Sequence, residues 1–225
     1  GTLYYKADTP VGTWTANKQG SDSLRGVTYG NGYWVAVGYS GRLYYKTDTP
    51  VGTWTANKQG SNNLHRITYG NGYWVAVGDN GTLYYKADTP VGTWTANNQG
   101  SDSLRGVTYG NGYWVAVGDN GTLYYKADTP VGTWTANKQG SDSLRGVTYG
   151  NGYWVAVGYS GRLYYKTDTP VGTWTANKQG TSILYDTTYH NGYWVAVGYG
   201  GRLCYRAKTL PTIPLDGAYA YIRAK

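Results

Sequence analysis

The sequence predicts an all-β fold, and three observations lead to this prediction. A unit of 40 residues repeats along the chain, and the phrase YGNGYWVAVG, which begins at Tyr29, returns at 69, 109 and 149. Turn-forming residues separate short runs rich in Tyr, Trp, Val and Thr, which favour β-strands. The chain has 35 Gly but no Met, and it has no Glu, so strong helix formers are scarce.

Each unit predicts four antiparallel strands. In the first set the strands span residues 24–29, 33–37, 42–46 and 52–57. Asn31-Gly32 predicts a tight hairpin turn between the first two strands, because both turn residues must take a positive φ. Pro50 marks the turn before the fourth strand, since proline cannot lie inside a central strand. Four antiparallel strands in 40 residues is the period of a β-propeller blade.

We expect a single propeller domain over residues 1–225. It consists of repeats 1–40, 41–80, 81–120, 121–160 and 161–200, followed by a divergent closing segment, 201–225. The chain opens with a hairpin that corresponds to the third and fourth strands of a unit and lacks the first two. Residues 212–225 predict another hairpin, around Asp216-Gly217. Pairing of the two hairpins would close a ring of six blades and cover two exposed sheet edges. A ring of five blades is the alternative, with one hairpin left over.

The repeats are unusually similar to one another. Residues 1–60 equal residues 121–180 letter for letter. Independent drift would not preserve such identity, so the duplication is recent or engineered.

Three stretches resemble known proteins. YYKADTPVGTW resembles the Asp-box turn of sialidase-like propellers at Asp8, Gly12, Thr13 and Trp14, although Lys6 replaces the serine of the motif and two extra residues precede Gly12. GNGYWVAVGDNGTLYYKAD and the ending TLPTIPLDGAYAYIRAK resemble bacteriophage tail and virion-associated proteins. The resemblance covers nearly the whole chain and implies a propeller whose aspartate turns are structural, on a virion or outside the cell.

Periodic residues are expected to build the fold. Tryptophan recurs every 20 residues, beginning with Trp14, Trp34, Trp54 and Trp74, and large flat side chains at this spacing favour packing between blades. Asp8, Asp48 and their copies precede Thr-Pro, where a turn carboxylate accepts backbone N–H groups.

One face of the ring is expected to bind ligands. In a propeller, loops such as 17–25 and turns such as 38–42 share a face, and most differences between the repeats fall in them. A tyrosine beside an arginine can stack on a sugar ring and hold a carboxylate or phosphate. The candidate ligand-binding residues are Tyr39, Arg42, Tyr159, Arg162, Tyr199, Arg202, Arg25, Arg66, Arg105 and Arg145.

Composition narrows the function. A net charge of +8 favours anionic partners. Without Glu, and with two His and a single Cys, the chain offers no glycosidase pair, catalytic triad or metal cluster, so we expect neither an enzyme nor a cofactor or metal. The basic residues are spread over all repeats, which makes nucleic acid an improbable partner. The longest apolar run is about five residues, far short of a membrane span.

The sequence therefore predicts a lectin-like module that binds acidic glycans, such as a bacterial surface polysaccharide, at several sites at once. The alternative is a purely structural, engineered or recently amplified propeller without a ligand. Because the chain does not begin with Met, we expect it to be part of a larger parent protein.

Overall fold

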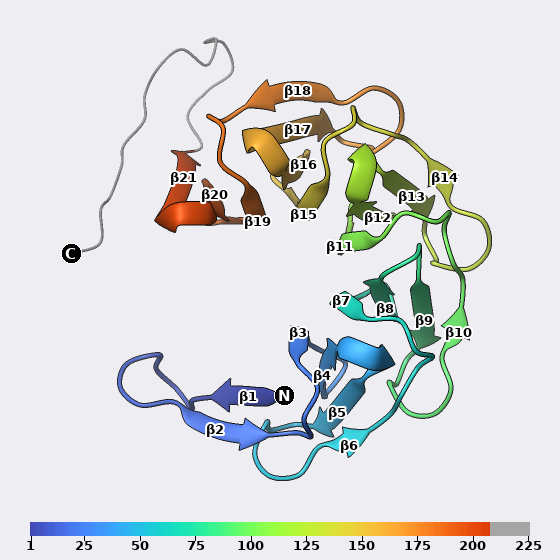
Figure 1. Cartoon of the computed structure of the whole chain (residues 1–225), viewed down its shortest axis with the longest axis vertical. Coiled ribbons are helices and arrows are strands. Elements are labelled where there is room, and N and C mark those ends of the chain that lie inside the picture. The colour runs from blue at the N-terminus through green and yellow to red at the C-terminus, as the bar shows by residue number, and fades with distance from the viewer. Residues whose placement is uncertain (208–225) are drawn as a thin grey trace.

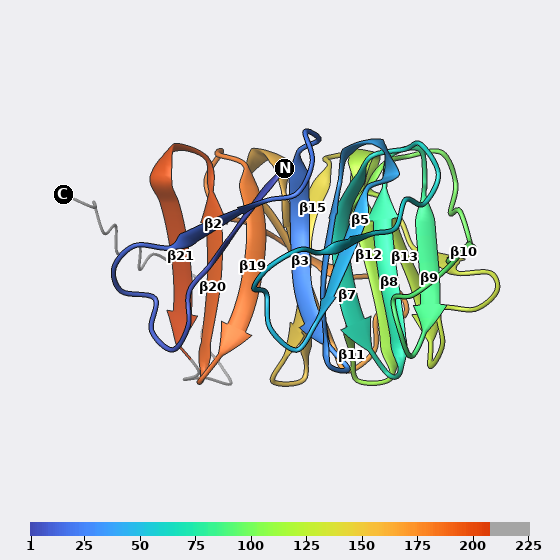
Figure 2. The ribbon, with the colours of Figure 1, turned by 90° about the horizontal axis from the view of Figure 1, so that it is seen from below.

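The computed structural model describes residues 1–207 of the 225-residue chain. This part of the chain is all-β, and its antiparallel sheets follow one another in sequence order around a hollow centre (Figure 1). The strands run along the axis of this arc (Figure 2). The predicted repetition of four-stranded antiparallel sheets is thus confirmed. The described sheets do not close into a ring, because the arc is open between β1–β2 and β19–β21.

Five sheets and one hairpin make up the arc. The first sheet contains β3 (Leu24–Gly30), β4 (Tyr33–Gly38), β5 (Leu43–Thr47) and β6 (Thr55–Ala56). The second contains β7 (Leu64–Gly70), β8 (Tyr73–Gly78), β9 (Leu83–Ala87) and β10 (Thr95–Ala96). The third contains β11 (Leu104–Gly110), β12 (Tyr113–Gly118), β13 (Leu123–Ala127) and β14 (Thr135–Ala136). The fourth contains β15 (Leu144–Gly150), β16 (Tyr153–Gly158), β17 (Arg162–Thr167) and β18 (Thr175–Lys178).

The two ends of the arc are smaller. The fifth sheet contains β19 (Leu184–His190), β20 (Tyr193–Gly198) and β21 (Arg202–Ala207). The N-terminal hairpin contains β1 (Thr2–Tyr5) and β2 (Thr15–Lys18). The hairpin expected around Asp216-Gly217, and its pairing with β1, lie outside the described residues.

The turns follow the predicted chemistry at the inner hairpin. Asn31 and Gly32 have φ values of 43° and 78°, so the expected positive-φ turn is confirmed. The turn after the second strand is a single 3₁₀ turn in four of the sheets. These turns are η1 (Tyr39–Gly41), η2 (Asp119–Gly121), η3 (Tyr159–Gly161) and η4 (Tyr199–Gly201).

The fourth strand is shorter than predicted. The sequence predicts a strand over 52–57, but β6 covers only Thr55–Ala56. Gly52 takes a φ of +82°, and the indole Nε1 of Trp54 donates to the carbonyl of Pro50 at 3.1 Å. The chain before Thr55 therefore belongs to the turn.

The aspartate turns also differ in detail from the prediction. Asp8 and Asp48 have φ values of 60° and 56°. Within residues 1–207 these turns are held through the aspartate main chain: the Asp48 carbonyl accepts from the Trp34 indole at 3.2 Å, and the Asp88 carbonyl accepts from the Asn31 amide at 2.8 Å. The expected contacts from backbone N–H groups to these carboxylates are not found there, because the positive φ already closes the turn.

The core lies between successive sheets. Val35, Val37 and Leu43 of the first sheet pack against Leu64 and Trp74 of the second. Trp54 and Trp74 are buried, as the packing role predicts, whereas Trp34 is half-buried and Trp14 is exposed. The same cluster recurs between the second and third and between the third and fourth sheets.

Both ends of the arc expose apolar positions that are buried elsewhere. Val27 of β3 is 54% exposed, whereas Val147, its counterpart in the identical stretch 121–180, is 6% exposed. At the other end, Leu203 of β21 is 43% exposed, against 1% for Leu43. Each end therefore presents a sheet face of the type that is covered by a neighbouring sheet inside the arc.

Candidate functional site

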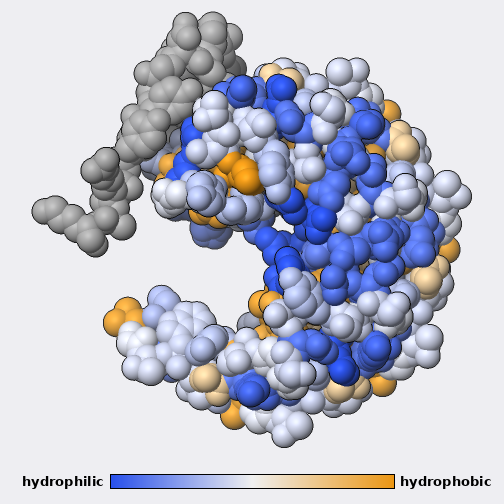
Figure 3. Space-filling view, in the orientation of Figure 1, coloured by the Kyte–Doolittle hydropathy of each residue, from blue (hydrophilic) through white to orange (hydrophobic). Residues whose placement is uncertain are grey.

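The candidate site lies on the face where the loops before each first strand meet the turns after each second strand. The backbone N–H of Tyr39 donates to the carbonyl of Ser23 at 2.9 Å, so the loop and the turn share one face as predicted. Figure 3 looks onto this face, and hydrophilic residues gather along the inner rim of the arc.

A β-bulge directs one side chain of each sheet onto this face. Leu24 pairs with Gly38, and the register then shifts between Leu24 and Gly26, so that Arg25 bulges out beside Tyr39. The same shift occurs in all five sheets. The residue that bulges out in each sheet occupies what we call the bulge position, and the five are Arg25, His65, Arg105, Arg145 and Tyr185. The first residue after each second strand occupies what we call the turn position, and the five are Tyr39, Asp79, Asp119, Tyr159 and Tyr199.

In the first and fourth sheets these positions form arginine–tyrosine pairs. The Arg25 guanidinium carbon lies 4.4 Å from the centroid of the Tyr39 ring, and Nη2 donates to the tyrosine hydroxyl. The Arg145 guanidinium lies 4.6 Å from the Tyr159 ring centroid, with the corresponding hydrogen bond at 2.6 Å. The tyrosine ring thus holds the cation by a cation–π contact and by its hydroxyl.

In the second and third sheets the same positions form an ionic network. His65 Nε2 lies 2.7 Å from Asp79 Oδ1 and 2.6 Å from Arg105 Nη1. Arg105 Nη2 donates to Asp119 Oδ2 at 2.6 Å. The hydrogen bond to Asp119 is the main reason that the pKa of Arg105 is raised. The network therefore joins two neighbouring sheets.

Burial and charge shift the pKa values of the network. Burial of the His65 ring lowers its pKa below the usual value, and the hydrogen bond with Asp79 offsets this only in part. Burial alone would raise the pKa of Asp79, but hydrogen bonds from His65 and Asn63 lower it on balance. These directions favour a neutral imidazole beside an ionised carboxylate.

The expected pairing of Tyr39 with Arg42 requires correction. Arg42 Nε donates to Asp22 Oδ2 at 2.7 Å, and Arg162 Nε donates to Asp142 at 2.6 Å. The two residues that flank each turn therefore have different partners. The arginine after the turn contacts the aspartate of the preceding loop, whereas the tyrosine before it contacts the arginine at the bulge. Arg202 differs again, since its Nε donates to Cys204 Sγ at 3.4 Å.

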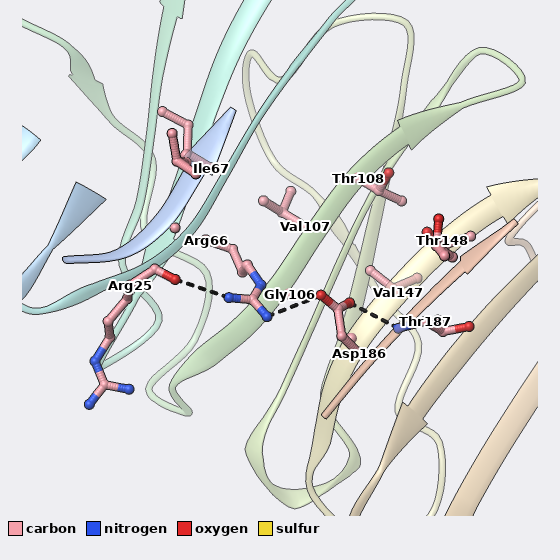
Figure 4. Close-up of a pocket in the computed structure, with 14 residues that line it drawn as sticks. Arg25, Arg66, Ile67, Gly106, Val107, Thr108, Val147, Thr148, Asp186 and Thr187 are labelled. Atoms are coloured by element: carbon pink, nitrogen blue, oxygen red, sulfur yellow. Dashed lines mark hydrogen bonds and ion pairs between the residues drawn. The ribbon is translucent and has the colours of Figure 1, made fainter. Parts of the chain in front are cut away.

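Arg66 differs from the other predicted arginines in facing the centre of the arc. It occupies the register of Gly26 and Gly106, and it reaches across the centre of the arc to Asp186 of β19 at 3.2 Å (Figure 4). Its Nη1 donates to the carbonyl of Arg25 at 3.2 Å. Arg66 and Asp186 line one end of a central cavity of about 430 Å³, whose wall consists of glycine, valine and threonine residues of the five inner strands.

The sequence interpretation missed several residues of this face. His65, Asp79, Asp119 and Asp186 were not predicted as site residues. Comparing the repeats column by column would have found the first three, because tyrosine stands at the turn position beside Arg25 and Arg145 whereas aspartate stands beside His65. The same comparison singles out Asp186, because its column reads Gly26, Arg66, Gly106, Gly146 and Asp186, although nothing in the sequence shows that these two repeats, 120 residues apart, meet across the centre.

Two other features are absent from the part of the chain that the structure describes. Residues 1–207 hold no cluster of three or more His, Cys, Asp or Glu side chains placed to bind a metal ion. Within the same residues, none of the helices has the length and apolar character that crossing a membrane requires.

Comparisons with known proteins bear on the fold. No protein-family model and no curated protein matches this chain. Among solved structures, the chain is similar to the crystal structure of Ika8, a computationally designed protein, with a TM-score of 0.66 and 9% sequence identity. The match covers 83% of this chain, and the chain spans 58% of the designed protein. At this identity the likeness supports the architecture of repeated sheets and carries no statement about function.

Proposed function

We propose that this chain is a non-enzymatic, lectin-like module that binds acidic surface glycans through the face of the bulge and turn positions. The observation that carries the proposal is the arginine–tyrosine pair, which occurs in the same geometry in the first and fourth sheets. A guanidinium beside an aromatic ring suits a sugar that bears a carboxylate, because the cation binds the acid and the ring offers an apolar surface.

Weak sites on one rigid face suit a ligand that repeats. Binding at one site raises the effective concentration of the glycan at the next, so affinity grows without new contacts. The net charge of +8 adds attraction toward an anionic surface. Bacterial surface polysaccharides present such repeated acidic sugars, and the resemblance to phage proteins motivates a place on a virion or outside the cell within a larger parent protein.

A catalytic role is a weaker explanation of the same face. His65 and Asp79 form a histidine–carboxylate pair, as hydrolases use, but Arg105 Nη1 lies 2.6 Å from the same ring nitrogen. A ring nitrogen carries either a proton or a lone pair, so only one of these contacts is a hydrogen bond in a given tautomer. With the proton on Nε2 it donates to Asp79, and with the lone pair there it accepts from Arg105, so neither tautomer leaves this nitrogen to a nucleophile. We therefore propose a binding module rather than an enzyme.

We propose further that the sheets are blades of a six-bladed propeller. The arc contains five sheets, and the hairpin β1–β2 supplies the third and fourth strands of a sixth. Residues 208–225 number 18, enough for the two missing inner strands and a turn. The exposure of Val27 and Leu203 supports this closure, because both lie on faces that a sixth sheet would cover. In a five-bladed ring the hairpin would have no place.

The first experiment is an array of bacterial glycans probed with the labelled chain. We expect binding to glycans with acidic sugars, and at least a tenfold loss in the double variant Arg25→Ala/Arg145→Ala. The double variant Arg42→Ala/Arg162→Ala should bind nearly as well, since those arginines already pair with Asp22 and Asp142. The absence of binding to every glycan, with the fold intact by circular dichroism, would reject the proposal.

That outcome would favour a structural role instead. The identity of residues 1–60 with 121–180 is the observation behind this second candidate, because repeated building blocks need no ligand to remain alike.

A further inference from the structure

The bulge-position arginines of the described residues fall into two electrostatic classes. Arg105 is the compensated one, and all three of its nitrogens have partners. Nη2 and Nε contact Asp119 at 2.6 and 3.2 Å, and Nη1 lies 3.4 Å from Asp79. Its side chain is 21% exposed. Its charge is thus balanced inside the protein by two carboxylates.

Arg25 and Arg145 form the uncompensated class. Within residues 1–207, neither has a carboxylate at salt-bridge distance, and each donates a single side-chain hydrogen bond, to the tyrosine hydroxyl. The Nε atom of Arg145 is buried and has no partner among these residues. Arg145 is half-buried, so its charge without a counter-ion is costly and an incoming anion relieves that cost, whereas Arg25 is exposed and offers the same pair at a lower cost.

The compensated arginine shows what the uncompensated ones lack. Asp119 stands at the turn position of the third sheet, where Tyr39 and Tyr159 stand in the first and fourth. Its carboxylate binds the bulge-position guanidinium through two nitrogens, which is the way in which a guanidinium receives a carboxylate from a ligand. In the third sheet the protein therefore supplies the acid itself.

We propose that a carboxylate-bearing sugar binds at two sites among the described sheets, Arg25/Tyr39 and Arg145/Tyr159, and that Asp79 and Asp119 close the equivalent positions of the second and third sheets. This inference rests on the proposed function and gives it a ligand class and a valency. The two sites lie three repeats apart, so a single short oligosaccharide occupies one of them, whereas a polymer bridges both.

A transplant within the protein tests the inference. Residues 119–122 read DNGT in the third sheet, and the corresponding turn reads YSGR in the first and fourth. The triple variant Asp119→Tyr/Asn120→Ser/Thr122→Arg writes YSGR into the third sheet. The arginine introduced at position 122 has a partner ready, because Asp102 stands where Asp22 holds Arg42 and at present accepts from Thr122 Oγ1 at 2.9 Å. The variant therefore copies a turn that the chain already folds.

The measurement is titration calorimetry with tetragalacturonate on the full chain. We expect two sites in the unmodified protein, one after Arg145→Ala, and three in the YSGR variant when Asp79→Asn also removes the second carboxylate, which lies 3.4 Å from Arg105 Nη1. The reverse change, Tyr39→Asp/Tyr159→Asp, should weaken binding at least tenfold, and circular dichroism should report an unchanged fold in each case.

Three results would overturn the inference. They are an equal number of sites in the unmodified protein and in the YSGR variant that also carries Asp79→Asn, undiminished binding after Tyr39→Asp/Tyr159→Asp, and binding of neutral sugars alone. In the last case the lectin-like function would survive while the acidic ligand would not. If neither tetragalacturonate nor any glycan of the array binds, both proposals are wrong.

Discussion

Val27 and Val147 offer a direct test of whether the ring closes. Both lie in identical 60-residue stretches, yet Val27 is 54% exposed and Val147 is 6% exposed among the described residues. Val→Ala removes two methyl groups, worth about 0.8 kcal/mol each when buried, and a cavity adds to the loss. For Val147→Ala we expect a loss of about 2 kcal/mol in the free energy of unfolding.

The open arc and the closed ring predict different costs for Val27→Ala. With half of the side chain in water and no cavity formed, the open arc predicts a loss of about 0.7 kcal/mol. A sixth sheet over β3 would bury Val27 as Val147 is buried, so closure predicts about 2 kcal/mol for both variants. The difference of roughly 1 kcal/mol or more is large compared with the error of a comparison between two variants.

Urea unfolding of the full chain, followed by tryptophan fluorescence, measures both costs. Equal slopes with urea would show that both variants unfold from the same kind of native state. Val107→Ala, at a position that is 8% exposed, serves as a second buried reference. If Val27→Ala proves milder than Val147→Ala by about 1 kcal/mol or more, the end face stays in water and the closure is wrong.

Three further predictions test the local structure. Gly38→Ala should unfold the chain or lower its melting temperature by many degrees, because the new Cβ would lie 2.0 Å from the Ser23 carbonyl oxygen. The control Gly32→Ala meets no atom within 4 Å and should cost only about 1 kcal/mol for its positive φ. Equal melting temperatures of the two variants would contradict the close approach at Gly38. Stability should fall as the pH drops below about 6.5, because burial lowers the pKa of His65 in the folded state and the unfolded chain then binds the proton first. His65→Gln should flatten the pH dependence of stability between about pH 7.5 and 5, as measured by urea unfolding at each pH. An unchanged dependence of the unfolding free energy on pH would show that His65 does not cause it. Asp79, whose pKa is also lowered, contributes only below about pH 4. Binding to an acidic polysaccharide should weaken as NaCl rises from about 50 to 500 mM, since exposed charges are screened, and salt-independent binding in a surface-based assay would exclude the guanidinium contacts.

Sequence reasoning recovered the features that depend on neighbours along the chain. The Asn31-Gly32 turn was predictable because its conformation is dictated by two residues. The order of four strands per repeat followed from the same local signals. The length of β6 was not predictable in this way, since Trp54 looks like a strand residue until its indole is seen to bond to Pro50 in the turn.

The shared face of the loops and turns was predicted, but the pairing of their side chains was not. The face was right because loop and turn positions follow from the strand order. Tyr39 was assigned to Arg42, which is three residues away, whereas its partner is Arg25. The bulge between Leu24 and Gly26 decides this pairing, and a bulge leaves no clear mark in a single sequence.

The bulge also explains why the repeats differ where they do. Leu24 pairs with Gly38 in a fixed register, so the two residues that follow them lie at the rim, and in the first four sheets they contact each other. Exchanging that pair, from Arg and Tyr to His and Asp, changes the charge and chemistry of the face without moving a core side chain. Two positions per repeat can thus vary in charge, while the core residues let every sheet pack on the next. The differences between the repeats fall mainly in the loops and turns around this pair, because these positions lie at the rim and outside the core that the sheets share.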